Sequence, residues 1–93
     1  MKIYISGPMT GYDDFNRKEF NKAALQIDIK GDTPINPAIL PDSLTQAEYM
    51  DICLAMLRAA DAIYMLNGFE ESKGAMCELA YAEKLGLKIM EQE

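Results

Sequence analysis

The chain alternates short apolar runs with longer amphipathic stretches, and this alternation predicts its secondary structure. Four short runs are predicted strands, at residues 2–6, 33–36, 61–66 and 87–90. Three longer stretches between them are predicted helices, at residues 13–31, 45–59 and 72–86. The β-α-β-α-β-α-β order predicts an α/β fold in which helices cover both faces of a parallel sheet. Without any linker, the chain is expected to be one domain, residues 1–93.

Polar residues and glycines at the helix ends give the expected boundaries. In the first helix, Phe20, Ala23, Ala24 and Ile27 follow the i, i+3, i+4, i+7 pattern of a buried helical face. Side chains that cap a helix N-terminus precede each helix, and glycines follow the first and third. The expected caps and stops are Asp13 or Asp14, Ser43 or Thr45, Ser72, Gly31 and Gly86.

Three loops are expected to meet at one edge of the sheet. They are residues 7–14, 36–43 and 67–72, each following the carboxyl end of a predicted strand. Ligands of open parallel sheets bind beyond these strand ends, where the chain order reverses. A binding site is therefore expected among these three loops.

The net charge of −6 argues against a nucleic-acid partner. Nine basic residues are scattered along the chain and are outnumbered by fifteen acidic ones, so there is no basic stripe to neutralise phosphates. One small phosphate remains possible, because backbone N–H groups can hold it. The sequence shows no secretory signal and no apolar run near the ~20 residues of a membrane span. A cytoplasmic protein without a membrane partner is expected.

The absence of histidine narrows the possible chemistry. It excludes Ser-His and Cys-His nucleophile pairs, and with only Cys53 and Cys77 it argues against a structural zinc site. The two cysteines have no CxxC spacing and are expected to be reduced thiols. No metal or cofactor is expected. Acid–base work would otherwise fall to carboxylates, Tyr, Lys or a bound cofactor.

The start of the third predicted helix has the features of an anion site. Ser72 can cap the helix, and Gly74 in its first turn lets a ligand approach the backbone. The free N–H groups of a helix N-terminus and the charge of Lys73 both favour an anion. An ordinary N-cap followed by a solvated lysine is the alternative, although glycine inside a helix costs up to ~1 kcal/mol relative to alanine.

Glu78 lies one helical turn after Gly74 and is the only charged residue between Lys73 and Glu83. A carboxylate in such an apolar stretch either faces solvent along a thin stripe or is held in a pocket. Burial would raise its pKa, and a nearby anion site would place it beside a cleft. Glu78 is therefore a candidate catalytic residue.

Two other features have a structural and a functional interpretation. The turn Ser6–Gly11 follows the first strand, as ligand-contacting turns often do, but it does not match GxGxxG. Tyr12 fits equally well as a base-stacking residue or as a cover for the edge of the core. Asp61 fits better as a structural turn residue, and Asp51 fits better on a solvated helix face.

The second predicted helix carries six apolar residues in a row, residues 52–57. One apolar face is enough to pack on a sheet, so a second apolar face suggests contact with another subunit. A homodimer or higher homo-oligomer through the 45–59 helix is therefore expected.

Four blocks of the sequence resemble the nucleoside 2-deoxyribosyltransferase-like superfamily, and most closely its short phage and bacterial DUF4406 group. The blocks are IYISGPMTGYDDFN (3–16), INPA (35–38), EYMDICLAMLRAADAIYML (48–66) and GFEESKGAMCELAYAEKLG (68–86). The resemblance implies a flavodoxin-like, Rossmann-like three-layer sandwich with a four- to five-stranded parallel sheet. It places the family's catalytic glutamate on Glu78, in a block resembling [D/S]-x-G-x-x-x-E. There the carboxylate attacks the anomeric carbon of a nucleoside and forms a covalent glycosyl intermediate.

The resemblance also implies a substrate class. Relatives with Ser at the first position of that block act on deoxynucleoside 5′-monophosphates, and this chain has Ser72 there. Serine at a helix N-terminus accommodates an anion that aspartate would repel. Residues in the matching blocks are expected to contact phosphate, sugar or base: Ser6, Gly7, Pro8, Met9, Thr10, Tyr12, Asn36, Phe69, Ser72 and Gly74.

One position departs from the family pattern. Many relatives carry an acid, which helps to protonate the leaving base, eight residues before the aspartate that opens the third strand. Here that position is Cys53, and Asp51, a possible assisting acid, is two residues away on another helical face.

The expected activity is cleavage or transfer at an N-glycosidic bond. A nucleotide-binding or nucleotide-sequestering module without catalysis is the alternative, and a purely structural oligomer ranks last.

Overall fold

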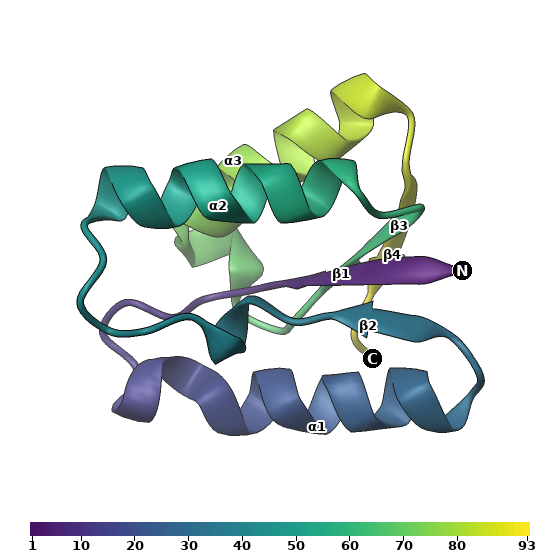
Figure 1. The fold of residues 1–93 in the computed structure, drawn as a ribbon, viewed down its shortest axis with the longest axis horizontal. Helices are drawn as coiled ribbons and strands as arrows, with labels where there is room; N and C mark the ends of the chain where they lie inside the picture. Colours follow the sequence, from purple (N-terminus) through teal and green to yellow (C-terminus); the bar gives the residue numbers. More distant parts are fainter.

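The computed structural model describes residues 1–93 and confirms the α/β class (Figure 1). Its four strands form one parallel sheet in the order β2-β1-β3-β4. They are β1 (Lys2–Ser6), β2 (Thr33–Ile35), β3 (Ala62–Met65) and β4 (Lys88–Glu91). The chain moves to one side from β1 to β2 and then crosses to the other side for β3. The order therefore reverses between β1 and β3, which is where open sheets of this type bind ligands.

Three helices complete a three-layer sandwich, consistent with a flavodoxin-like fold. They are α1 (Arg17–Ile29), α2 (Gln46–Arg58) and α3 (Lys73–Leu85). In Figure 1, α1 covers one face of the sheet, while α2 and α3 cover the other. Alternate residues of β1 supply both cores: Ile3 and Ile5 pack with α1, and Tyr4 packs with α2 and α3. No helix has the length and apolar character that a membrane crossing requires.

The predicted start of the first helix is wrong. Neither Asp13 nor Asp14 caps it; residues Asp13–Asn16 form a 3-10 turn, η1, and α1 begins at Arg17. Asp14, Phe15 and Asn16 adopt positive φ angles of 47°, 53° and 63°. Side-chain contacts hold this unusual turn, because Arg17 pairs with Asp14 and the Asn16 amide donates to the Pro8 carbonyl. These tertiary contacts outweigh the capping preference of aspartate.

The other helix ends follow the sequence closely. Thr45, rather than Ser43, caps α2 in a reciprocal capping box with Glu48. Ser72 caps α3, and Gly86 ends it with a φ of 74°. Two 3-10 turns, η2 (Pro37–Ile39) and η3 (Phe69–Glu71), shape the loops that precede α2 and α3. The loops after β1, β2 and β3 therefore converge at the carboxyl ends of the strands.

Candidate functional site

A cavity of about 610 Å³ opens at the carboxyl end of β1. Its walls come from the loop after β1, from η1, from the first turns of α2, and from the start of α3. The volume lies within the range of about 300–1,000 Å³ typical of small-molecule sites. The cavity is therefore large enough for a nucleotide, and it lies where the sheet topology places a ligand.

Glu78 lies in the wall of this cavity and is the buried carboxylate of the molecule, 6% exposed. Its Oε1 accepts a hydrogen bond from Ser6 Oγ at 2.6 Å, and its Oε2 accepts one from the Tyr4 hydroxyl at 2.8 Å. Both donors come from β1, whereas Glu78 comes from the middle of α3. The hydrogen bonds therefore fix a helix side chain against the end of a central strand.

Only neutral groups stabilise this carboxylate. None of the ion pairs of the protein involves Glu78. Burial raises the pKa of Glu78, and the hydrogen bonds from Ser6 and Tyr4 partly oppose that rise. Burial, and then the charge of Glu78, raises the pKa of Tyr4, so the phenol stays protonated and donates. A buried carboxylate without a cation partner keeps its electron density available for attack on an electrophile.

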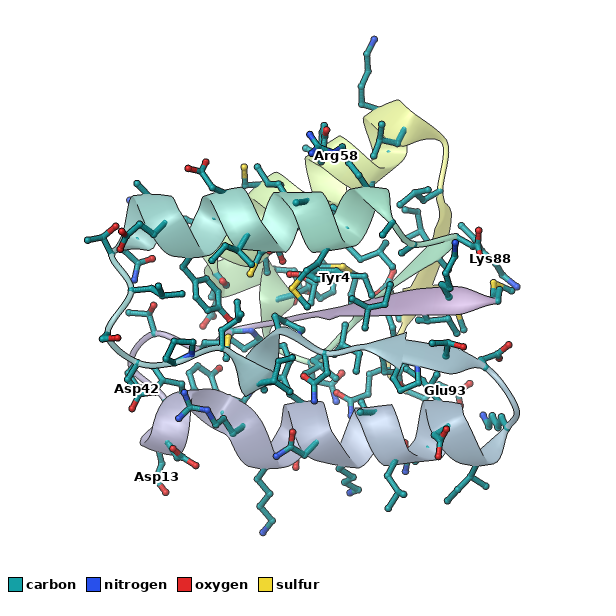
Figure 2. All side chains as sticks on the ribbon, in the orientation of Figure 1. Tyr4, Asp13, Asp42, Arg58, Lys88 and Glu93 are labelled. Atoms are coloured by element: carbon teal, nitrogen blue, oxygen red, sulfur yellow. The ribbon has the colours of Figure 1, made fainter.

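Cys53 extends this cluster beneath Tyr4. Its side chain is fully buried, and burial raises the pKa of the thiol to about 11. The thiol is therefore neutral at physiological pH and lies beside the hydroxyls of Tyr4 and Tyr49. Figure 2 shows Tyr4 between β1 and α2, the space that this cluster fills. Cys53 does not line the cavity, so its thiol is not placed to protonate a leaving group there.

The N-terminus of α3 faces the cavity with free backbone donors. Ser72 Oγ accepts the Ala75 N–H at 3.2 Å, but no protein acceptor binds the N–H groups of Lys73 or Gly74. A Cβ added at Gly74 would approach only Met50 Sδ, at 3.6 Å, which is ordinary van der Waals contact. Packing within the protein therefore does not explain the glycine. Its missing side chain instead leaves two amides open to the cavity.

Most of the residues predicted from the sequence line the cavity. These are Gly7, Pro8, Met9, Thr10, Tyr12, Ser72, Gly74 and Glu78. Packing explains why position 7 is a glycine, since a Cβ there would lie 2.7 Å from the Cβ of Leu66. Convergence of these residues confirms that the loops after β1 and β3 meet at one edge.

Four predicted residues lie outside the lining. Ser6 is fully buried and donates to Glu78 instead of facing the cavity. The side chain of Asn36 caps η2 and donates to Asn21, so it stabilises a turn. Phe69 packs against the core between the sheet, α2 and α3. Asp51 is exposed on α2 and does not line the cavity.

Tyr4, Tyr49 and Arg17 are among the site residues that were not predicted. Tyr4 could have been found from strand alternation, because it lies two residues before Ser6 on the same face of β1. Tyr49 lines the cavity one helical turn before Cys53, and it donates to the Pro37 carbonyl at 3.3 Å. Arg17 has no sequence signal, because its position depends on the left-handed turn of η1.

Arg17 ties two walls of the cavity together. Its guanidinium donates to the carbonyls of Ala38 at 3.1 Å and Leu40 at 3.3 Å, and it pairs with Asp14 and Asp42. These bonds connect the start of α1 to the loop between η2 and α2. Figure 2 shows Asp42 and Asp13 at the same end of the molecule. With most of its N–H groups already bonded, Arg17 is suited to hold the cavity wall rather than to bind an anion.

Two solved structures resemble this fold over nearly the whole chain. One is a 2-deoxyribosyltransferase from Leishmania mexicana, 26% identical, with a TM-score of 0.78; the match covers 97% of this chain and 62% of that one. The other is a 2-deoxyribosyltransferase from Bacillus psychrosaccharolyticus, 19% identical, with a TM-score of 0.77; it covers 98% of this chain and 71% of that one. The chain thus spans less than two thirds of the length of the Leishmania enzyme.

The sequence comparisons give a family without an assigned activity. No match is found among the curated proteins. Residues 1–91 match the family described as Domain of unknown function (DUF4406). The family match covers almost all of the chain, and the fold agrees with that of the two transferases. The chain therefore belongs to the DUF4406 family and has a nucleoside 2-deoxyribosyltransferase-like fold.

Proposed function

We propose that the protein binds a nucleoside or deoxynucleoside 5′-monophosphate in this cavity and cleaves or transfers at its N-glycosidic bond. The observation that carries the proposal is the position of Glu78. It is a buried carboxylate without a cation partner, in the wall of a nucleotide-sized cavity, one helical turn after two free backbone amides. That combination supplies a nucleophile and an anion site one helical turn apart along α3.

The chemistry follows the two-step scheme of a carboxylate nucleophile. A lone pair of Glu78 forms a bond to C1′ of the sugar while the bond between C1′ and the base nitrogen breaks. The bonding electrons leave with the base, which takes a proton from water. Water then attacks C1′ of the glycosyl ester and releases the sugar phosphate, or a second base attacks in its place and gives a transfer product.

The start of α3 is the proposed phosphate site. Ser72, Lys73 and Gly74 all line the cavity, and the N–H groups of Lys73 and Gly74 have no acceptor within the protein. Together with the partial positive charge of the helix N-terminus, they favour a bound dianion. Glu71 also lines the cavity and opposes an anion there. A comparison of monophosphates with nucleosides therefore tests this step directly.

One observation favours the alternative of a binding module without catalysis. No acidic side chain of α2 lines the cavity, and Asp51 is exposed on the outer surface of the helix. Cys53, which is buried on the same helix, carries a neutral thiol. The leaving base would then have no dedicated proton donor on α2. Such a protein would hold a nucleotide and cleave it slowly or not at all.

Release of free base distinguishes the two functions. The wild-type protein is incubated with each deoxynucleoside monophosphate and with the corresponding nucleosides, and the base is measured by chromatography. We expect release from at least one monophosphate, faster than from its nucleoside. Binding without release would support the module, and absence of binding by every compound would contradict the proposed function.

We also propose that two copies associate through the outer surface of α2. Ile52, Ala55 and Ala59 are exposed there. Asp51 and Arg58 are seven residues apart, so they lie two turns apart on the same helical face. In a two-fold antiparallel pair of α2 helices, Asp51 faces Arg58 of the second copy twice, around the small Ala55. Figure 2 shows Arg58 on the side of α2 away from the sheet, and its side chain is exposed.

A charge swap tests this interface. Asp51→Arg brings like charges together and is expected to weaken the dimer about tenfold or more in Kd, as measured by sedimentation. Arg58→Asp should have a similar effect, and the double variant should restore association. A double variant no better than the single ones would contradict this pairing.

A further inference from the structure

The two oxygens of Glu78 have different surroundings. Oε2 is bonded to Tyr4, which lines the cavity, whereas Oε1 is bonded to Ser6, which is fully buried and does not line it. The hydroxyl of Ser6 has no other hydrogen-bond partner than Glu78. Each oxygen of Glu78 therefore has one protein donor, and only the donor to Oε2 borders the cavity.

The buried Ser6 hydroxyl has no evident structural task apart from Glu78. Every other residue of β1 that faces into a core is apolar or aromatic, namely Ile3, Tyr4 and Ile5. A buried hydroxyl is costly unless it is hydrogen-bonded, and here its only bond goes to the carboxylate. Ser6 and Tyr4 are the only side chains that donate a hydrogen bond to Glu78. No cationic side chain pairs with it.

We propose that Ser6 is a positioning residue, whose hydrogen bond to Oε1 fixes the orientation in which the Glu78 carboxylate attacks C1′. The attack on C1′ rests on the proposed function, whereas the anchoring does not. Ser6 thus has a different task from the substrate contact that its place in the turn suggested. The Tyr4 hydroxyl also donates to this carboxylate, and the bond from Ser6 keeps the carboxylate from rotating as the new bond to C1′ forms.

Replacing Ser6 by alanine is the first arm of the test. Ala is smaller than Ser and suits a buried strand, so the variant should fold. We expect kcat for base release to fall roughly tenfold or more, because a hydrogen bond to a charged group is lost. KM should change little, since Ser6 does not line the cavity. Ser6→Thr retains the hydroxyl and should recover most of kcat.

The second arm measures the ionisation of Glu78 without any turnover. The Glu78 carboxyl carbon is titrated by ¹³C NMR in the substrate-free protein, as wild type and as Ser6→Ala. Loss of a donor to the anion raises the pKa of Glu78, so its titration and the acidic limb of the pH–activity profile should both move to higher pH. Ser43→Ala, a change at an exposed serine, is the matched control and should move neither.

The outcomes separate the two proposals. An unchanged Glu78 titration in Ser6→Ala would overturn the anchoring role, and so would a change in KM with kcat intact. If the titration moves but the wild type releases no base from any nucleotide, Ser6 still anchors the carboxylate and the proposed function fails. Recovery of both the titration and kcat by Ser6→Thr would support the full proposal.

Discussion

The Glu78→Gln variant loses base release by a factor on the order of 10⁴ or more while it still binds nucleotide. The amide has nearly the same shape as the carboxylate, so the cavity and the α3 amides stay in place. It has no negative charge, however, and cannot form the glycosyl ester at C1′. Base release is measured by chromatography, and the affinity for the monophosphate is measured by calorimetry on the same preparations.

A second carboxylate on the same helix provides the matched control. Glu83 is exposed on α3, five residues after Glu78, and it does not line the cavity. Glu83→Gln should therefore keep both activity and affinity within a few-fold of the wild type. If Glu78→Gln releases base at the wild-type rate, another group is the nucleophile. If it loses binding as well as release, Glu78 acts in recognition rather than in attack.

The identity of this candidate nucleophile could be predicted from local sequence, but its surroundings could not. Glu78 stands out because it interrupts an apolar stretch, and Ser72 because it opens a helix. The partners of Glu78 lie 72 and 74 residues away along the chain, at Ser6 and Tyr4. Only the register of β1 against β3 and the packing of α3 bring them together.

The same contrast applies to the fold. The periods of the apolar residues and the capping chemistry predicted the elements and most of their ends, since both are local properties. The η1 turn was missed because Asp14, Phe15 and Asn16 adopt positive φ angles that non-glycine residues rarely visit. Bonds from Arg17 to the loop before α2 help to hold this turn, and no local pattern encodes them.

Gly74→Ala separates stability from binding, and we expect the two to move in opposite directions. A Cβ at this position meets only Met50 Sδ, at 3.6 Å, so the fold accommodates it. Alanine is the better helix residue, and the free energy of unfolding should stay the same or rise by up to ~1 kcal/mol. The methyl group would, however, stand beside the free amides of Lys73 and Gly74. Affinity for the monophosphate should therefore fall about tenfold or more, which corresponds to about 1.4 kcal/mol.

A glycine outside the cavity provides the matched control, at which we expect a loss of stability without a loss of affinity. Gly31 precedes β2, has a φ of 91°, and does not line the cavity. Gly31→Ala should lower the free energy of unfolding by ~1–2 kcal/mol, because a side chain is strained in the left-handed region, and it should leave nucleotide affinity unchanged. Urea unfolding and calorimetry on both variants complete the comparison.

If Gly74→Ala binds monophosphate and nucleoside as tightly as the wild type does, the phosphate does not lie at the start of α3. A loss that is larger for the monophosphate than for the nucleoside places the phosphate there, because the methyl group obstructs only the site of the anion.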